Sequence, residues 1–126
     1  MNILYIIRGV SGSGKTTLAH QLSSVVYSAD DWFTNSAGDY NFDASKLGEA
    51  HDNCQRNVEY AMTQKAPNIA VANTFSQAWE AELYFKLAKK FNYSTFVVEC
   101  QNSFENVHGV PQETINAMKE RWDSLT

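Results

Sequence analysis

The sequence has few of the features that would place it in a membrane or an oxidising compartment. It contains only two cysteines, Cys54 and Cys100, and these lack the paired spacing of a zinc site. No apolar run approaches the roughly 18 residues of a membrane span. The first residues show neither the basic start nor the small-residue cleavage site of a signal peptide. We therefore expect a cytoplasmic protein with reduced, structural cysteines, without zinc and without membrane association.

Positive charge is scarce as well. The formal net charge is −4, and the only arginines are Arg8, Arg56 and Arg121. Proteins that hold long nucleic acids normally use basic patches that displace counterions from many phosphates. This chain can hardly form such a patch, so its composition argues against extended nucleic acid as a partner. Small substrates, or the ends of a nucleic acid, fit the charge better.

The chain does contain a phosphate-binding motif. Residues 9–16 read Gly-Val-Ser-Gly-Ser-Gly-Lys-Thr, the pattern G-x-x-x-x-G-K-[ST], and they follow the apolar run 3–7. Glycines of this pattern allow positive φ and a close approach of the backbone, whose N–H groups then surround a polyphosphate at a helix N-terminus. A flexible Gly/Ser turn is the alternative, but the flanking residues favour a nucleotide site. The expected nucleotide-binding residues are Gly9, Ser11, Gly12, Ser13, Gly14, Lys15, Thr16 and Thr17, with Lys15 on the β- and γ-phosphates and Thr16 on Mg²⁺.

Short apolar runs alternate with helical patterns over the rest of the chain. Strands are predicted at about 3–7, 25–29, 68–72 and 93–100, and helices at about 16–24, 44–65, 78–91 and from 111 onward. This alternation predicts an α/β fold over residues 1–126, one domain with a parallel sheet between helices. The predicted inner face of helix 44–65 is Leu47, Ala50, Cys54, Val58 and Ala61, and that of helix 78–91 is Trp79, Leu83, Leu87 and Phe91. Asp43 is the expected N-cap of the first of these helices.

Ligands of such sheets bind at the carboxyl ends of the strands. Asp30 and Asp31 end the second predicted strand. A carboxylate there faces the P-loop and could accept a proton from an attacking hydroxyl or hold water on the metal. The alternative is that one of them only caps the next turn. We expect Asp30 to be catalytic together with Lys15, and to join Thr16 at the metal.

Other polar and aromatic residues near these strand ends are weaker candidates. Four aromatic residues after the aspartates could stack on a base or, as we favour, anchor a loop: Trp32, Phe33, Tyr40 and Phe42. His108 could close over the phosphates or form a turn, and Arg8 and Arg121 could bring charge to the site or pair with carboxylates. The candidate substrate-contacting residues are Asp31, Trp32, Asn73, Thr74, His108 and Arg121.

Together these segments resemble the polynucleotide-kinase-like branch of the P-loop kinases, which includes bacteriophage 5′-kinase domains and small ATP-dependent kinases. The matching segments are 6–17, 28–33, 73–80, 106–111 and 118–122. The resemblance implies a three-layer P-loop fold with sheet order 2-3-1-4, ATP and Mg²⁺ as cofactors, Asp30 as general base and residues 101–110 as a lid. It also fits a phage or bacterial protein of the host cytoplasm.

Three departures from the family pattern bear on activity. The third predicted strand ends in Asn73-Thr74 without the acidic residue that the family often has, and residues 103–106 lack the lid arginine. Such arginines are worth ~10³–10⁵ in rate. Phe33 stands where the polynucleotide enzyme has an arginine for the phosphate of the acceptor, which speaks against a nucleic-acid end as substrate.

The sequence leaves three functions open. The first is a kinase that transfers the γ-phosphate of ATP to a nucleotide, nucleoside, oligonucleotide 5′-end or other small alcohol. The second is a nucleotide-binding module without transferase activity, and the third is an ATP hydrolase. The guanine-reading segment of GTPases is missing from the sequence, which argues against a GTPase switch.

Overall fold

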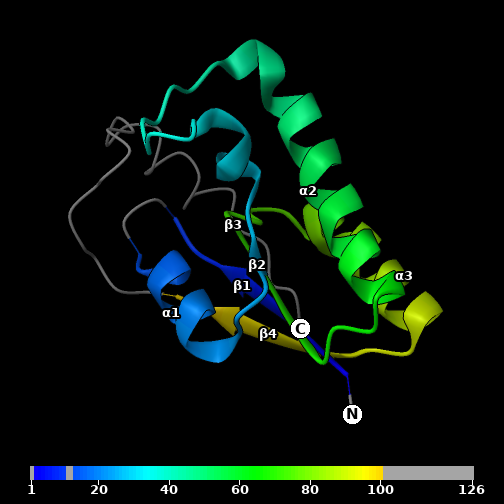
Figure 1. Cartoon of the computed structure of the whole chain (residues 1–126). Coiled ribbons are helices and arrows are strands. Elements are labelled where there is room, and N and C mark those ends of the chain that lie inside the picture. The colour runs from blue at the N-terminus through cyan, green and yellow to red at the C-terminus, as the bar shows by residue number, and fades with distance from the viewer. Residues whose placement is uncertain (1, 11–12, 101–126) are drawn as a thin grey trace.

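A computed structural model describes residues 2–10 and 13–100 (Figure 1). Its centre is one parallel sheet with the strand order β2-β3-β1-β4. The strands are β1 (Ile3–Arg8), β2 (Val26–Tyr27), β3 (Asn68–Asn73) and β4 (Ser94–Glu99). In the register of the sheet, Ile6 of β1 lies between Val71 of β3 and Val97 of β4. The predicted fold class and strand order are thereby confirmed.

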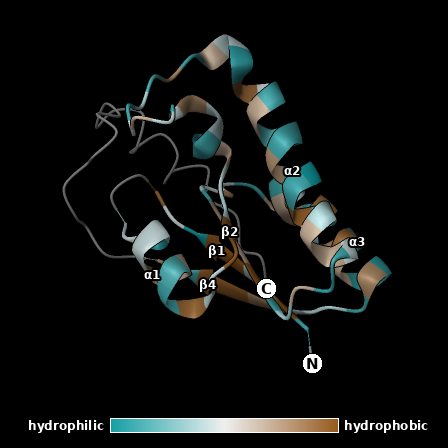
Figure 2. Cartoon of the chain, in the orientation of Figure 1, coloured by the Kyte–Doolittle hydropathy of each residue, from teal (hydrophilic) through white to brown (hydrophobic). Residues whose placement is uncertain are grey.

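Helices cover both faces of the sheet, as the alternating pattern predicts. They are α1 (Lys15–Leu22), α2 (Leu47–Thr63) and α3 (Ala78–Phe91), with the short 3₁₀ helices η1 (Ala29–Phe33) and η2 (Ala44–Lys46) between them. Leu4 and Ile6 of β1 pack against α2 and α3, whereas Ile7 packs against Ala19 of α1. Figure 2 shows the apolar residues concentrated in the strands between these layers. In the described residues, none of the helices combines the length and apolar character needed to cross a membrane.

Two element boundaries differ from the prediction. β2 has only two residues, because the chain turns into η1 at Ala29, with Ser28 as its N-cap. The predicted helix 44–65 divides into η2 and α2. The Asp43 carboxylate accepts a hydrogen bond from the Ser45 backbone N–H at 3.0 Å, so the predicted cap is confirmed at the start of η2. The predicted last helix lies outside the described residues.

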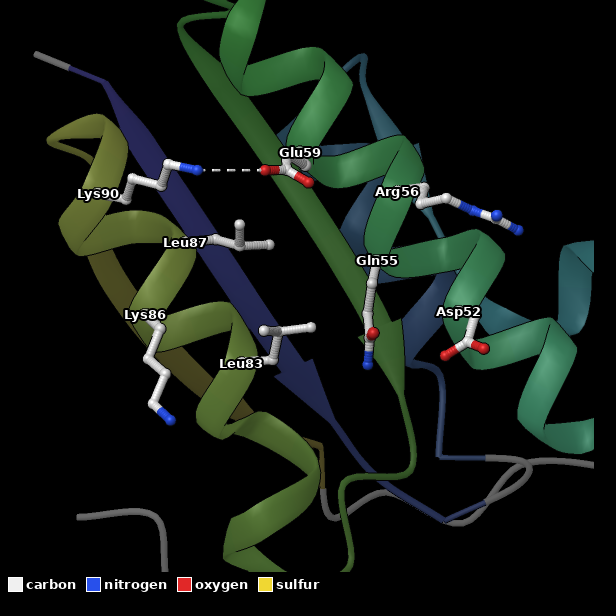
Figure 3. Close-up of a pocket in the computed structure, with 8 residues that line it drawn as sticks. All are labelled: Asp52, Gln55, Arg56, Glu59, Leu83, Lys86, Leu87 and Lys90. Atoms are coloured by element: carbon white, nitrogen blue, oxygen red, sulfur yellow. Dashed lines mark ion pairs between the residues drawn. The ribbon is translucent and has the colours of Figure 1, made fainter.

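The predicted inner face of α3 is wrong in part. Trp79 is 69% exposed and Leu83 39% exposed, while Ala81, Tyr84, Leu87 and Ala88 are buried. Alanines let α3 approach the sheet closely, and the Tyr84 ring packs edge-on against Phe75 with centroids 5.6 Å apart. Leu83 instead lines, together with the buried Leu87, a groove of about 490 Å³ between α2 and α3, crossed by the Lys90–Glu59 ion pair (Figure 3). Leu47, predicted on the inner face of α2, is also exposed.

Gly48 offers a test of the energetics of α2. It is exposed near the helix N-terminus, without positive φ, and no atom would lie within 4 Å of an added Cβ. Because glycine loses more backbone entropy than alanine in a helix, Gly48→Ala is expected to raise the free energy of unfolding by about 0.5–1 kcal/mol. Thermal unfolding followed by circular dichroism measures the change. Gly38→Ala, equally uncrowded but at φ +86°, should lower stability; equal shifts for both variants would contradict this account.

Candidate nucleotide-binding and catalytic site

The P-loop joins β1 to α1 at the carboxyl edge of the sheet. Gly14, directly before α1, has φ 86°, a left-handed conformation that favours glycine. Gly9 does not have positive φ, and glycine is required there because a side chain would not fit. A Cβ at this position would overlap the Ser13 hydroxyl and lie 3.1 Å from the Cys100 carbonyl oxygen. The expectation of positive φ therefore holds at Gly14 and is wrong at Gly9. Ser11 and Gly12 lie outside the described residues.

Ser13 carries a buried hydroxyl that the described part of the chain leaves without a hydrogen-bond partner. The residue is 1% exposed. An unpaired buried hydroxyl is unfavourable, since it has lost its hydrogen bonds to water. A phosphate oxygen could accept a hydrogen bond from this hydroxyl. The residues present therefore fit a polyphosphate in the P-loop, on an observation independent of the motif.

Lys15 begins α1 and its side chain is buried. Burial lowers the pKa of its ammonium group from the ordinary 10.5, and the nearby Asp30 carboxylate and Cys100 thiol act in the opposite direction. A buried ammonium is stabilised by an anion placed beside it. Thr16 and Thr17 follow in the first turn of α1, both exposed. The two predicted catalytic residues, Lys15 in α1 after β1 and Asp30 in η1 after β2, thus both lie at the carboxyl edge of the sheet.

The two aspartates of η1 have separate surroundings. Asp31 takes part in a capping box: its carboxylate accepts a hydrogen bond from the Ser28 N–H at 3.1 Å, while the Ser28 hydroxyl accepts one from the Asp30 N–H at 3.2 Å. Burial raises the pKa of Asp31. The Asp30 carboxylate accepts a hydrogen bond from the Tyr40 hydroxyl at 3.3 Å. Capping, the alternative considered for both aspartates, therefore belongs to Asp31.

Asn73 and Thr74 lie where β3 ends. Asn73 is buried, and its side chain binds protein groups: Oδ1 accepts hydrogen bonds from the Ala29 N–H at 2.8 Å and from the Ser28 hydroxyl at 3.4 Å. Its Nδ2 donates to Cys54 Sγ at 3.7 Å. Thr74 is half-buried. Asn73 thus lies beside the site and contacts the segment that carries Asp30.

The aromatic residues after Asp31 divide into anchoring and exposed ones. Phe33 is buried, with its ring edge-on to Phe42 at 5.1 Å and to Tyr40 at 6.3 Å between centroids. These contacts hold the loop after η1 onto α2 through Ala50. Trp32 remains 44% exposed. The favoured loop-anchoring interpretation describes Phe33 and Tyr40, and it does not describe Trp32.

Arg8 has a structural environment. It is buried, its Nη2 donates to the Phe75 carbonyl at 2.6 Å, and its Nη1 lies 3.5 Å from Oε1 of Glu99. These contacts join β1 to β4 and to the turn before α3. Of the two alternatives for Arg8, the ion pair is the one present. His108 and Arg121 lie outside the described residues.

Two contacts at the site were not predicted from the sequence. Tyr40, considered there only for base stacking or loop anchoring, donates a hydrogen bond to Asp30 from a loop ten residues along the chain. Cys100 adjoins the P-loop because its N–H donates to the Arg8 carbonyl at 2.8 Å, which continues the pairing of β4 with β1. The second of these could have been found, since sheet order 2-3-1-4 places the residue after the fourth strand beside the residue after the first.

A parallel sheet of this order, with a P-loop between its first strand and first helix, defines the P-loop nucleotide-binding class. The AAA domain family AAA_33 matches residues 4–125, and the chain belongs to this family.

Relatives and solved structures agree with this assignment. The chain is 36% identical to human NEDD4-binding protein 2 over 134 aligned residues, which cover 95% of this chain and 8% of that protein. It is 28% identical to the uncharacterized protein PM0531 of Pasteurella multocida, covering 94% of this chain and 75% of that one. The APS kinase CysC of Mycobacterium tuberculosis, solved with AMPPNP and APS, has a similar fold, with a TM-score of 0.54 and 20% identity over 79% of this chain and 62% of that one.

Proposed function

We propose that the protein is an ATP- and Mg²⁺-dependent kinase that transfers the γ-phosphate to a hydroxyl group of a nucleotide, nucleoside, oligonucleotide 5′-end or other small alcohol. The observation that carries this proposal is the hydrogen bond from the Ala29 N–H to Asn73, which lies opposite Arg8 at the P-loop end of β1, because this bond holds Asp30 at the same edge of the sheet as Lys15. A cation for the phosphates and a carboxylate for the acceptor are the two groups that phosphoryl transfer to an alcohol needs from the protein. The likeness to a kinase solved with a nucleotide analogue supports it.

Each side chain of the site has a role in this proposal. Ser13 and Lys15 bind the phosphates. The Ser13 hydroxyl, which has no hydrogen-bond partner in the described residues, donates a hydrogen bond, and Lys15 contributes its positive charge. Thr16 and Asp30 would hold Mg²⁺, which neutralises charge on the phosphate oxygens when bound. The described residues contain no group of three His, Cys, Asp or Glu side chains that could hold a metal by themselves. The metal would therefore depend on oxygens of the nucleotide, as expected for Mg²⁺ at a triphosphate.

Asp30 would also act on the acceptor. Its carboxylate takes the proton of the acceptor hydroxyl, directly or through a water, as that oxygen forms its bond to the γ-phosphorus. The bond between the γ-phosphorus and the β–γ bridging oxygen breaks, and ADP leaves with that electron pair. The hydrogen bond from Tyr40 orients the carboxylate for this step.

A nucleotide-binding module without transfer is the second candidate, and the environment of Arg8 favours it. The sequence lacks a lid arginine, and Arg8, which could have replaced its charge, is buried against Glu99 and the Phe75 carbonyl. The kinase then depends on Lys15, Mg²⁺ and residues outside the described part of the chain. A partner subunit could also supply the missing charge.

A labelling experiment separates these functions. The protein is incubated with γ-labelled ATP, Mg²⁺ and a panel of nucleosides, nucleotides, 5′-hydroxyl oligonucleotides and small alcohols, with Lys15→Ala as the inactive control. Label on an acceptor, lost in the variant, supports the kinase. ATP binding without any transfer supports the binding module, and label released only as free phosphate supports the hydrolase.

The pKa of Lys15 gives a test of ATP binding itself. Burial lowers this pKa in the free protein, so the side chain loses its proton at lower pH than an exposed lysine. Phosphate charge favours the protonated form, so ATP binding just below pH 10.5 should take up a proton, and affinity should fall as pH rises through this range. Calorimetry in two buffers of different ionisation enthalpy measures the uptake. Lys15→Arg, which stays charged, should abolish it; the same uptake in that variant would assign the proton to another group.

A further inference from the structure

We infer that Asn73 is a positioning residue for phosphoryl transfer: its side-chain amide holds η1, and with it Asp30, against the carboxyl end of β3. This role rests on the proposed function, in which Asp30 receives the proton of the acceptor. Asn73 does not touch the reacting atoms in this account. It acts through the backbone of the residue before Asp30.

The contacts of Asn73 join the two halves of the site. Asn73 is the last residue of β3, is 5% exposed, and lies opposite Arg8, the last residue of β1 and the one before Gly9. Its Oδ1 accepts the Ala29 N–H at 2.8 Å, and Ala29 directly precedes Asp30. One buried side chain thus fixes the start of η1 at a sheet position next to the P-loop.

β2 is too short for its own pairing with β3 to reach η1. Pairing between β2 and β3 covers only Val26 with Ala70 and Tyr27 with Val71. The backbone hydrogen bonds between β2 and β3 end at Tyr27, three residues before Asp30. The bonds from Ser28 and Ala29 to Asn73 Oδ1 continue the attachment where the ladder ends.

The amide of Asn73 is also held in one orientation. Nδ2 donates to Sγ of the buried Cys54 in α2 at 3.7 Å, so the oxygen faces η1. Burial raises the pKa of the Cys54 thiol, which therefore remains neutral beside the amide. Catalysis is sensitive to such fixing, because misplacing a reacting group by about 1 Å can lower the rate by ~10²-fold.

The test compares Asn73→Ala, Asn73→Asp and Asn68→Ala by kcat, KM for ATP and melting temperature. Asn68 is the matched control, at the opposite end of β3. Asn73→Ala should lower kcat by roughly 10–100-fold while KM for ATP stays within about twofold of wild type. Asn73→Asp, which can still accept the Ala29 N–H, should retain more of kcat than Asn73→Ala does. Asn68→Ala should keep the kcat of wild type.

The outcomes separate the positioning role from the proposed function. Two results overturn the positioning role and leave the proposed kinase function intact. One is a wild-type kcat in Asn73→Ala, and the other is a lower kcat accompanied by weaker ATP binding and a lower melting temperature. Absence of transfer by the wild-type protein to every acceptor overturns the proposed function and the positioning role with it. Since Asn73→Asp keeps the shape of the side chain, it decides the matter if the alanine variant does not fold.

Discussion

Replacing Asp30 by asparagine is expected to lower the rate of phosphoryl transfer by about 10²–10⁴-fold, the usual contribution of a general base. The amide has the size of the carboxylate but cannot accept the proton of the acceptor. ATP affinity measured without Mg²⁺ should change little, because Lys15 and the rest of the P-loop remain in place, whereas the contribution of Asp30 to Mg²⁺ binding is lost. Single-turnover transfer of label, with ATP binding measured separately, gives both quantities.

Asp31→Asn is the matched control for this prediction. Asp31 closes the capping box of η1 through the Ser28 N–H, and the amide oxygen of asparagine can still accept that hydrogen bond, so Asp31→Asn should leave both stability and transfer largely intact. The same substitution at two neighbouring aspartates is thus expected to lower transfer at only one of them. If Asp31→Asn abolishes transfer and Asp30→Asn does not, the roles assigned to the two carboxylates are reversed.

The fold could be predicted because its signals are local. The P-loop pattern identifies a strand, a turn and a helix in fixed order, and alternation of apolar runs with helical patterns extends this to the whole sheet. The inner face of α3 could not be predicted in the same way. A stripe from Trp79 to Phe91 is the more hydrophobic face of that helix, yet the alanines at 81 and 88 pack on the sheet. The small alanine side chains let α3 pack closely on the sheet, and this packing determines which face of α3 is buried. The hydrophobicity of the sequence does not show it.

Candidate site residues could be named from the sequence where they depend on single elements, whereas contacts between elements could not be predicted. Lys15 and Asp30 each follow from a strand end. The hydrogen bond of Tyr40 to Asp30 depends on the path of a loop, and that of Asn73 depends on where the ladder of β2 stops. Arg8 shows the same limit, since its partner Glu99 lies on a strand 91 residues further along the chain. Such pairs require the tertiary structure.

Gly9→Ala is expected to weaken ATP binding on the order of 10²-fold, comparable to losing a preorganised hydrogen-bond donor. Gly9 has no unusual φ, so the reason is steric: the new methyl group would overlap the Ser13 hydroxyl and approach the Cys100 carbonyl oxygen to 3.1 Å. Ser13 is buried, with only 1% of its surface exposed. The methyl group therefore displaces the hydroxyl proposed to bind phosphate, together with the backbone that carries it.

A double-mutant cycle with Ser13→Ala tests this steric explanation, with ATP affinity measured by calorimetry. Ser13→Ala removes the overlapping oxygen, so Gly9→Ala should weaken binding much less in that background than in wild type. The Ser13 Cβ, 3.1 Å from the added methyl group, limits the rescue to a partial one. Gly48→Ala, where the added Cβ meets no atom, should leave ATP affinity unchanged. Additive effects of the Gly9 and Ser13 substitutions would show that the two sites act independently and that the space at Gly9 serves another purpose.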